Sequence, residues 1–124
     1  MPTPPSSPSP TPLLVACLCA DWCGTCREYR TLFDQLATRM TGVHFVWIDV
    51  EDESDLVDPI EVEDFPTILI ASPHHALFFG TVLPHSQTLQ RLIETQQAEP
   101  TRALAAGDDL DALVRRLWQR ERAA

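Results

Sequence analysis

Basic residues are scarce in this chain. It carries 9 Lys and Arg against 18 Asp and Glu, which gives a net charge of -9. Nucleic acids and anionic membranes attract basic surfaces, so this balance argues against either as the main partner. The chain also lacks any apolar run near the roughly 20 residues that span a bilayer. Its 124 residues therefore predict one soluble domain with a substantial core.

Cysteine is absent outside one short stretch. All 4 cysteines lie between positions 17 and 26. They cannot connect distant parts of the chain as the disulfides of a secreted scaffold do. We expect them to belong to one site.

A secretory signal is also lacking at the N-terminus. Residues 1–12 are almost all Pro, Ser and Thr, without a basic segment or a long apolar stretch. Such a composition buries too little apolar area to offset the entropy of ordering, so we expect a disordered tail. The lack of a signal and the clustered cysteines favour a cytoplasmic location, with export by a trimmed or unconventional route as the alternative.

Two cysteines, Cys23 and Cys26, stand at a predicted junction of strand and helix. Residues 13–18 are apolar over the length of a strand. The apolar residues that follow recur at helical spacing: Tyr29, Phe33, Leu36, Ala37 and Met40. The N–H groups at a helix N-terminus favour an anion, and a thiolate is an anion. This placement predicts a dithiol redox centre in which Cys23 is the more acidic thiol.

The middle of the chain alternates strands and helices. Residues 43–50 predict a second strand, parallel to the first because a helix connects them. The acidic residues 51–58 are either a short helix capped by Ser54 or a solvated loop. Residues 65–71 and 76–81 predict a third strand and a hairpin partner, and Ser86 is expected to cap the helix that follows.

The last predicted helix, residues 109–121, carries an apolar stripe. Its members are Leu110, Leu113, Val114, Leu117 and Trp118. We expect this helix to cover the sheet face opposite the cysteine-bearing helix and to bury Trp118. The alternative is a stripe that is buried only in a dimer.

The chain resembles the thioredoxin superfamily over residues 13–97. The resemblance rests on residues 20–27 (ADWCGTCR), on Asp49 at the end of the second strand, on residues 65–67 (FPT) and on Gly80. It implies an α/β, three-layer α/β/α fold with a mixed four-stranded sheet. The family's first strand and helix are lacking, and a C-terminal helix is added. The expected division is a tail (1–12), a thioredoxin-like domain (13–97), and a linker with the amphipathic helix packing on the domain (98–124).

The resemblance also implies a function, thiol–disulfide oxidoreduction on protein substrates. Cys23 would attack the substrate disulfide and Cys26 would resolve the mixed disulfide. Substrate would contact Trp22, Gly24 and Thr25, and the backbone of Phe65, which precedes a cis Pro66 that faces the dithiol. The expected partners are protein disulfides and an unidentified reductase. We expect a monomer that needs no cofactor or metal.

The chain departs from the family pattern near the dithiol. Thr25 stands where thioredoxins usually have proline, and Cys17 replaces their buried acid. The lysine usual on the second strand is missing, with Phe45 in its neighbourhood. These departures leave the reduction potential and the proton acceptor for Cys26 open.

Cys17 and Cys19 allow several interpretations. Two apart on a strand, they share the face beneath the helix, and as small buried hydrophobes they would stay reduced when Cys23 and Cys26 are oxidised. An accessory redox role is the next alternative. The four thiols could instead hold zinc or an iron–sulfur cluster. A non-catalytic interaction or redox-sensing module on the same fold also stays open, with an exposed stripe on the last helix as the interaction module's signature.

Overall fold

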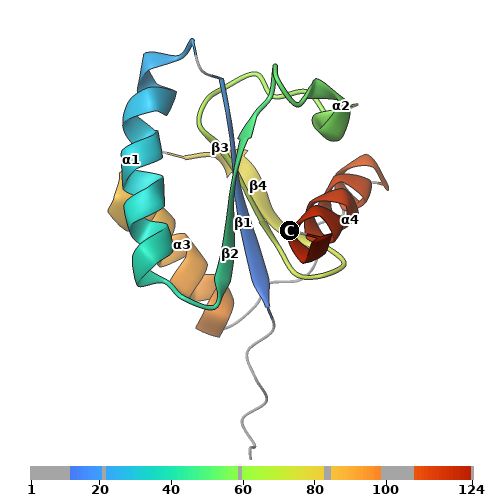
Figure 1. Cartoon of the computed structure of the whole chain (residues 1–124). Coiled ribbons are helices and arrows are strands. Elements are labelled where there is room, and N and C mark those ends of the chain that lie inside the picture. Colours follow the sequence, from blue (N-terminus) through green and yellow to red (C-terminus); the bar gives the residue numbers. More distant parts are fainter. Residues whose placement is uncertain (1–11, 21, 59, 83–84, 99–107, 124) are drawn as a thin grey trace, which may run out of the picture.

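The protein is a four-stranded mixed sheet covered by helices on both faces (Figure 1). The computed structural model describes residues 12–20, 22–58, 60–82, 85–98 and 108–123. The predicted disordered tail, apart from Pro12, and almost all of the predicted linker lie outside these residues. The expected α/β fold with three layers is confirmed, including the additional C-terminal helix.

Strand β1 (Leu13–Cys19) lies at the centre of the sheet. It pairs in parallel with β2 (Val43–Asp49) and antiparallel with β3 (Thr67–Ala71), which in turn pairs antiparallel with the edge strand β4 (Ala76–Thr81). Every residue of β1 is buried, as its continuous apolar sequence requires of a strand covered on both faces. Its carboxyl end at Cys19 leads directly into the cysteine motif.

The third strand begins later than predicted. The sequence predicts it from residue 65, but pairing with both neighbours starts at Thr67. Pro66 has no N–H to donate to a ladder, so the strand begins after it. The Thr67 hydroxyl donates to the Asp64 carbonyl at 2.6 Å and closes the turn that leads in.

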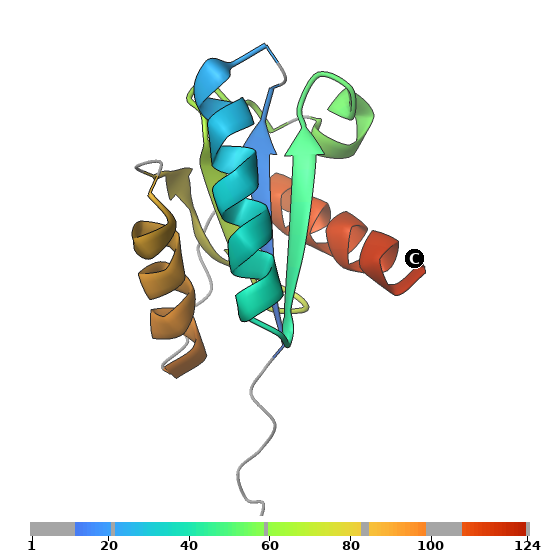
Figure 2. The ribbon, with the colours of Figure 1, turned by 60° about the vertical axis from the view of Figure 1, so that its left-hand side comes forward.

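Helices α1 (Gly24–Arg39) and α3 (Ser86–Ala98) cover one face of the sheet (Figure 2). They pack on alternate residues of β1, because successive side chains of a strand point to opposite faces. The buried residues contributed by β1, α1 and α3 to this layer are Leu13, Val15, Cys17, Cys19, Cys26, Tyr29, Phe33, Leu36, Leu89 and Ile93. All three cysteines buried in this layer therefore lie between β1 and α1.

Helices α2 (Ser54–Val57) and α4 (Asp108–Ala123) cover the other face. The predicted stripe packs there on the remaining β1 side chains; the residues involved are Leu14, Ala16, Leu18, Leu110, Leu113, Val114, Leu117 and Trp118. Trp118 is 5% exposed, and its Nε1 donates to the Ser72 carbonyl at 2.8 Å. The prediction that Trp118 is buried against this face is confirmed.

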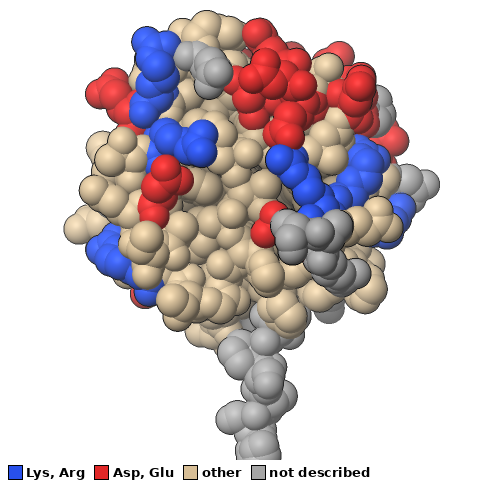
Figure 3. All heavy atoms as spheres, viewed as in Figure 1, with Lys and Arg blue, Asp and Glu red and all other residues tan. Residues whose placement is uncertain are grey.

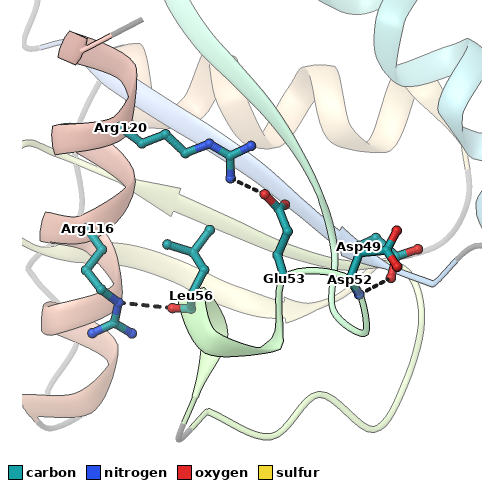
Figure 4. A network of polar contacts seen from close by, with 6 residues as sticks. All are labelled: Asp49, Asp52, Glu53, Leu56, Arg116 and Arg120. Atoms are coloured by element: carbon teal, nitrogen blue, oxygen red, sulfur yellow. Dashed lines mark hydrogen bonds and ion pairs between the residues drawn. The ribbon is translucent and has the colours of Figure 1, made fainter.

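Polar contacts join α4 to α2 (Figure 4). Arg116 donates to the carbonyls of Leu56 at 3.0 Å and Asp58 at 3.1 Å, and Arg120 pairs with Glu53 at 2.6 Å. Arg116 thus satisfies backbone carbonyls at the end of a helix too short to be stable alone, and Arg120 pairs with a side chain at its start.

The short helix is present, but the predicted cap is wrong. Glu53 occupies the N-cap position without a side-chain hydrogen bond, and Ser54 is the first helical residue. The chain enters α2 through a tight turn in which the Glu53 N–H donates to the Asp49 carbonyl at 2.9 Å. With this turn the helix starts at Ser54 itself, one residue earlier than it would start if Ser54 were the cap.

Candidate functional site

The site forms where β1 ends and α1 begins. Cys23 is the N-cap residue of α1, with extended backbone angles; its N–H donates to the Ala20 carbonyl at 3.0 Å. Its carbonyl accepts the N–H of Arg27 at 3.2 Å, the first bond of the helix. Cys23 is half-buried, and Gly24 and Thr25 are exposed. Cys23 is thus the cysteine at the surface, beside the α1 N–H groups.

The structure joins Cys19 to Cys26 in a disulfide, with their Cα atoms 5.8 Å apart. Cys17 and Cys23 are free thiols. The prediction that Cys19 stays reduced as a small buried hydrophobe is wrong in this structure. Cys19 and Cys26 both point into the layer between β1 and α1, and their Cα separation is one that a disulfide can bridge.

Cys17 lies directly next to this disulfide. Its Sγ is 3.8 Å from that of Cys19, and both side chains are fully buried. Burial raises the pKa of the Cys17 thiol far above its ordinary value, and Arg30 offsets only part of this effect. Cys17 is therefore a neutral thiol at physiological pH.

Aromatic side chains form the rim of the site. Trp22 is 63% exposed and meets the Phe65 ring edge to face, with centroids 5.7 Å apart. The Phe65–Pro66 peptide bond is cis, as expected. The contact brings the segment before β3 next to the motif, although the two are distant in sequence. Trp22 and Phe65, predicted to bind substrate, are thus brought together.

An acidic turn after β2 completes the rim. Trp22 Nε1 donates to Glu51 Oε2 at 2.7 Å. Asp49 Oδ1 accepts the N–H of Glu51 at 2.9 Å. It also accepts the N–H of Asp52 at 3.1 Å, as Figure 4 shows. Figure 3 shows acidic side chains gathered at one end of the molecule, with arginines beside them.

The part played by Glu51 was missed in the sequence. An Asp at a strand end followed by acidic residues signals a turn in which the Asp side chain accepts backbone N–H groups. That signal predicts the turn, but it does not indicate the distant Trp22 as a partner of Glu51.

A cavity of about 150 Å³ opens beside Cys26, lined by Ala20, Cys26, Arg27, Arg30 and Trp47. The Arg30 guanidinium lies over the Trp47 ring, 4.9 Å from its centroid, and pairs with Asp34 at 3.4 Å. The cavity therefore presents positive charge near a sulfur that is itself 1% exposed.

The metal-site alternative finds no support in the part of the chain described. No group of three or more His, Cys, Asp or Glu is arranged there to hold a metal ion. Two of the four sulfurs that it would need are bonded to each other. Among the same residues, no helix has the length and apolarity that would let it cross a membrane.

The chain is similar to thioredoxins of known sequence. It is 34% identical to thioredoxin H2-1 of Oryza sativa subsp. japonica over 61 residues, which are 49% of this chain and 44% of that protein. It is 29% identical to thioredoxin-1 of Caenorhabditis elegans over 90 residues, 73% of this chain and 78% of that protein. The match thus spans less than half of the rice protein and most of the nematode one.

Solved thioredoxin structures have the same arrangement. A thioredoxin from Nicotiana alata superposes with a TM-score of 0.63 at 26% identity, covering 70% of this chain and 75% of the other. Thioredoxin from Fasciola hepatica gives 0.63 at 22% identity, covering 68% and 81%. The family model described as Thioredoxin matches residues 8–94, which is more than half of the sequence. With the dithiol motif at the end of a central strand and a cis proline opening the strand beside it, this chain belongs to the thioredoxin family.

Proposed function

We propose that the chain is a thiol–disulfide oxidoreductase that reduces disulfides in protein substrates. The observation that carries the proposal is the position of Cys23. It is a free, half-buried thiol at the N-terminus of α1, three positions before the buried Cys26 and next to the exposed ring of Trp22. The names of the similar proteins, all thioredoxins, agree with this function.

The reaction consists of two exchange steps. The Cys23 thiolate attacks one sulfur of the substrate disulfide, forms a mixed disulfide and expels the other sulfur as a thiolate. Cys26 then attacks the Cys23 sulfur, which forms the Cys23–Cys26 disulfide and expels the second substrate thiolate. The substrate gains two electrons and two protons, and the dithiol loses them. An unidentified reductase would return the electrons, without a cofactor bound to this chain.

The rim would hold the substrate. An extended substrate segment would lie along the Phe65 backbone just before the cis Pro66, as an added strand does at a sheet edge. Trp22 would form the wall of this groove, and the exposed Gly24 and Thr25 would allow close approach to Cys23. Recognition of backbone rather than side chains suits an enzyme that accepts several protein substrates.

Cys26 must lose its proton to act as the resolving thiol. Cys17 stands where the family has a buried acid, and a neutral thiol cannot serve as a base. The cavity beside Cys26 is large enough for a few water molecules, each of about 30 Å³ in the liquid. We infer that water in this cavity takes the proton and that Arg27 and Arg30 favour the thiolate that remains.

The same proposal includes a monomer that works in the cytoplasm. The apolar stripe of α4 is already buried within the chain, so it is not available as a dimer interface or as the docking surface of an adaptor. The cysteines form one site instead of the distributed pairs of a secreted scaffold. Neither nucleic acid nor membrane is expected as a partner of a chain with net charge -9.

Insulin reduction with dithiothreitol as the electron source tests the proposed function. We expect Cys23→Ser to abolish the acceleration given by the wild-type protein. Reduced Cys26→Ser, freed of dithiothreitol and then mixed with insulin, should accumulate a mixed disulfide through Cys23. Cys17→Ala is the matched control, since Cys17 is buried and neutral, and should keep most of the activity. If Cys23→Ser were as active as the wild type, the proposal would be wrong.

A further inference from the structure

The buried sulfurs suggest that a third cysteine, outside the two-cysteine motif, takes part in the disulfide exchange. We propose that Cys19 is a third redox-active cysteine. After each oxidation it replaces Cys23 as the disulfide partner of Cys26, which leaves Cys23 as a free thiol. This inference rests on the proposed function, because that function produces the Cys23–Cys26 disulfide from which the transfer starts.

The positions of the cysteines make Cys26 a shared partner. Cys26 bonds to Cys19 in the structure, with the Cα atoms 5.8 Å apart. Cys23 packs against the buried layer between β1 and α1 that contains Cys26. It precedes Cys26 by three positions, and side chains three positions apart on a helix are neighbours. One sulfur therefore has a possible partner on each side, one at the end of β1 and one at the surface.

The transfer is a single thiol–disulfide exchange. The Cys19 thiolate attacks Cys26 Sγ, the Cys19–Cys26 bond forms, and the Cys23–Cys26 bond breaks. Cys23 leaves with the electron pair as a thiolate. The proton that Cys19 gives up passes to Cys23 or to solvent, so the protein as a whole is neither oxidised nor reduced.

Burial favours the products of this exchange. Cys19 and Cys26 are 0% and 1% exposed, so their disulfide puts no charge in the interior, whereas the released Cys23 thiolate lies at the start of α1. The Cys17 thiol, whose sulfur is 3.8 Å from that of Cys19, can donate a hydrogen bond to the attacking thiolate. The attack itself requires a thiolate in an apolar layer, so we expect it to be slower than the first two steps.

The transfer changes what an oxidised molecule can do. After it, the protein stores a disulfide in its interior and still presents a reactive thiol beside Trp22. That thiol can attack a second substrate disulfide, but Cys26 is occupied and cannot resolve the mixed disulfide. An oxidised molecule would therefore hold its next substrate covalently until a reductant arrives.

Titration of the native, fully reduced protein with excess 5,5′-dithiobis(2-nitrobenzoic acid) tests the proposal by counting the thionitrobenzoate released. Cys23 and then Cys26 release about two equivalents, and transfer to Cys19 lets Cys23 react again for a total of about three, the last in a slower phase. We expect Cys19→Ala to stop at about two equivalents. Cys17→Ala, the control for a change at the neighbouring buried cysteine, should still reach about three, with a slower last phase because it lacks the Cys17 hydrogen bond. Cys23→Ser should give almost none.

Two equivalents from both the wild type and Cys19→Ala would overturn the proposal. Insulin reduction separates this failure from failure of the proposed function, because Cys19→Ala retains Cys23 and Cys26 and should remain active. If the wild type itself reduces no insulin, mapping of the disulfide after mild oxidation decides the transfer alone. A Cys19–Cys26 bond with Cys23 alkylated supports the transfer, and a Cys23–Cys26 bond contradicts it.

Discussion

Cys17 is the residue whose chemistry the structure alters most. Its pKa is raised above the ordinary value of 9.0 by burial. At a pH above 9.0 the unfolded chain therefore releases a proton that the folded chain keeps. Its contribution to stability is complete below that pH and is lost as the pH rises further.

We predict that the free energy of unfolding falls as the pH rises above 9.0, and falls less in Cys17→Ala. Denaturant titrations at several pH values measure this, in a Cys19→Ala, Cys26→Ala background that has no disulfide to exchange. The sequence contains no lysine and a single tyrosine, so few other groups titrate in this range. Burial also raises the pKa of Tyr29 above 10.0, so the comparison is cleanest below that pH. Parallel curves for the two proteins would contradict the prediction.

Arg30 is the second residue with a specific expected effect. It lines the cavity beside Cys26, where we propose that the resolving thiolate forms. Arg30→Met keeps much of the contact with Trp47 but removes the charge, and should slow insulin reduction roughly two- to five-fold, as a partly exposed charge is worth about 1 kcal/mol or less. Arg39→Met, at the far end of α1, serves as the control. Equal rates for the two variants would show that the cavity charge has no part in resolution.

At the scale of elements, the turn between β2 and α2 depends on one carboxylate. Asp49 accepts two backbone N–H groups, those of Glu51 and Asp52. We expect Asp49→Ala to lower the free energy of unfolding by about 1 to 3 kcal/mol, because two donors lose a charged acceptor. Thermal unfolding compares this variant with Asp52→Ala, whose exposed side chain should matter little. A larger loss in Asp52→Ala would contradict this account of the turn.

Helix α4 is expected to stabilise the domain through its buried stripe. Leu117 is 0% exposed on the sheet, whereas Arg115 on the same helix is exposed. Leu117→Ala should cost about 2 to 5 kcal/mol, and Arg115→Ala within about 0.5 kcal/mol. Denaturant unfolding measures both values, and sedimentation checks the proposed monomeric state. Similar small losses would mean that α4 does not support the sheet in solution.

The elements were predictable where one interaction dominates. The continuous apolar run of β1 and the period of α1 and α4 each follow from burial. The structure has β1 and α4 within two residues of their predicted bounds, and α1 where its apolar period predicts a helix. The cis Pro66 came from the family resemblance, since nothing in the residues alone fixes the isomer. Covering of the second face by α4 followed from the lack of any other apolar surface of that length.

The sequence did not predict the bond between Cys19 and Cys26. Alternation along β1 placed Cys17 and Cys19 on the correct face, but the choice of partner depends on how far α1 slides along the strand. A shift of about one residue along a strand, roughly 3.3 Å, decides whether two cysteines can bond. The contact of Glu51 with Trp22 likewise depends on where two loops meet.

At the scale of the whole molecule, charge should affect the choice of substrate. The net charge is -9, and Glu51 lies directly at the rim. We predict that the dication cystamine oxidises the reduced protein faster than the dianion dithiodiglycolate, and that the ratio of rates falls towards one between about 10 mM and 300 mM salt as screening increases. Glu51→Gln, which keeps an acceptor for Trp22, should lower the ratio at low salt. A ratio independent of salt would contradict this effect.

The three tryptophans have three different surroundings. Trp22 is exposed at the rim, Trp47 is half-buried beneath Arg30, and Trp118 is buried between α4 and the sheet. Indole emission shifts to longer wavelength in water and is quenched by nearby sulfur, so each ring reports on its own surroundings. Variants that retain one tryptophan at a time would make chemistry at Cys23 and detachment of α4 visible as two separate fluorescence signals.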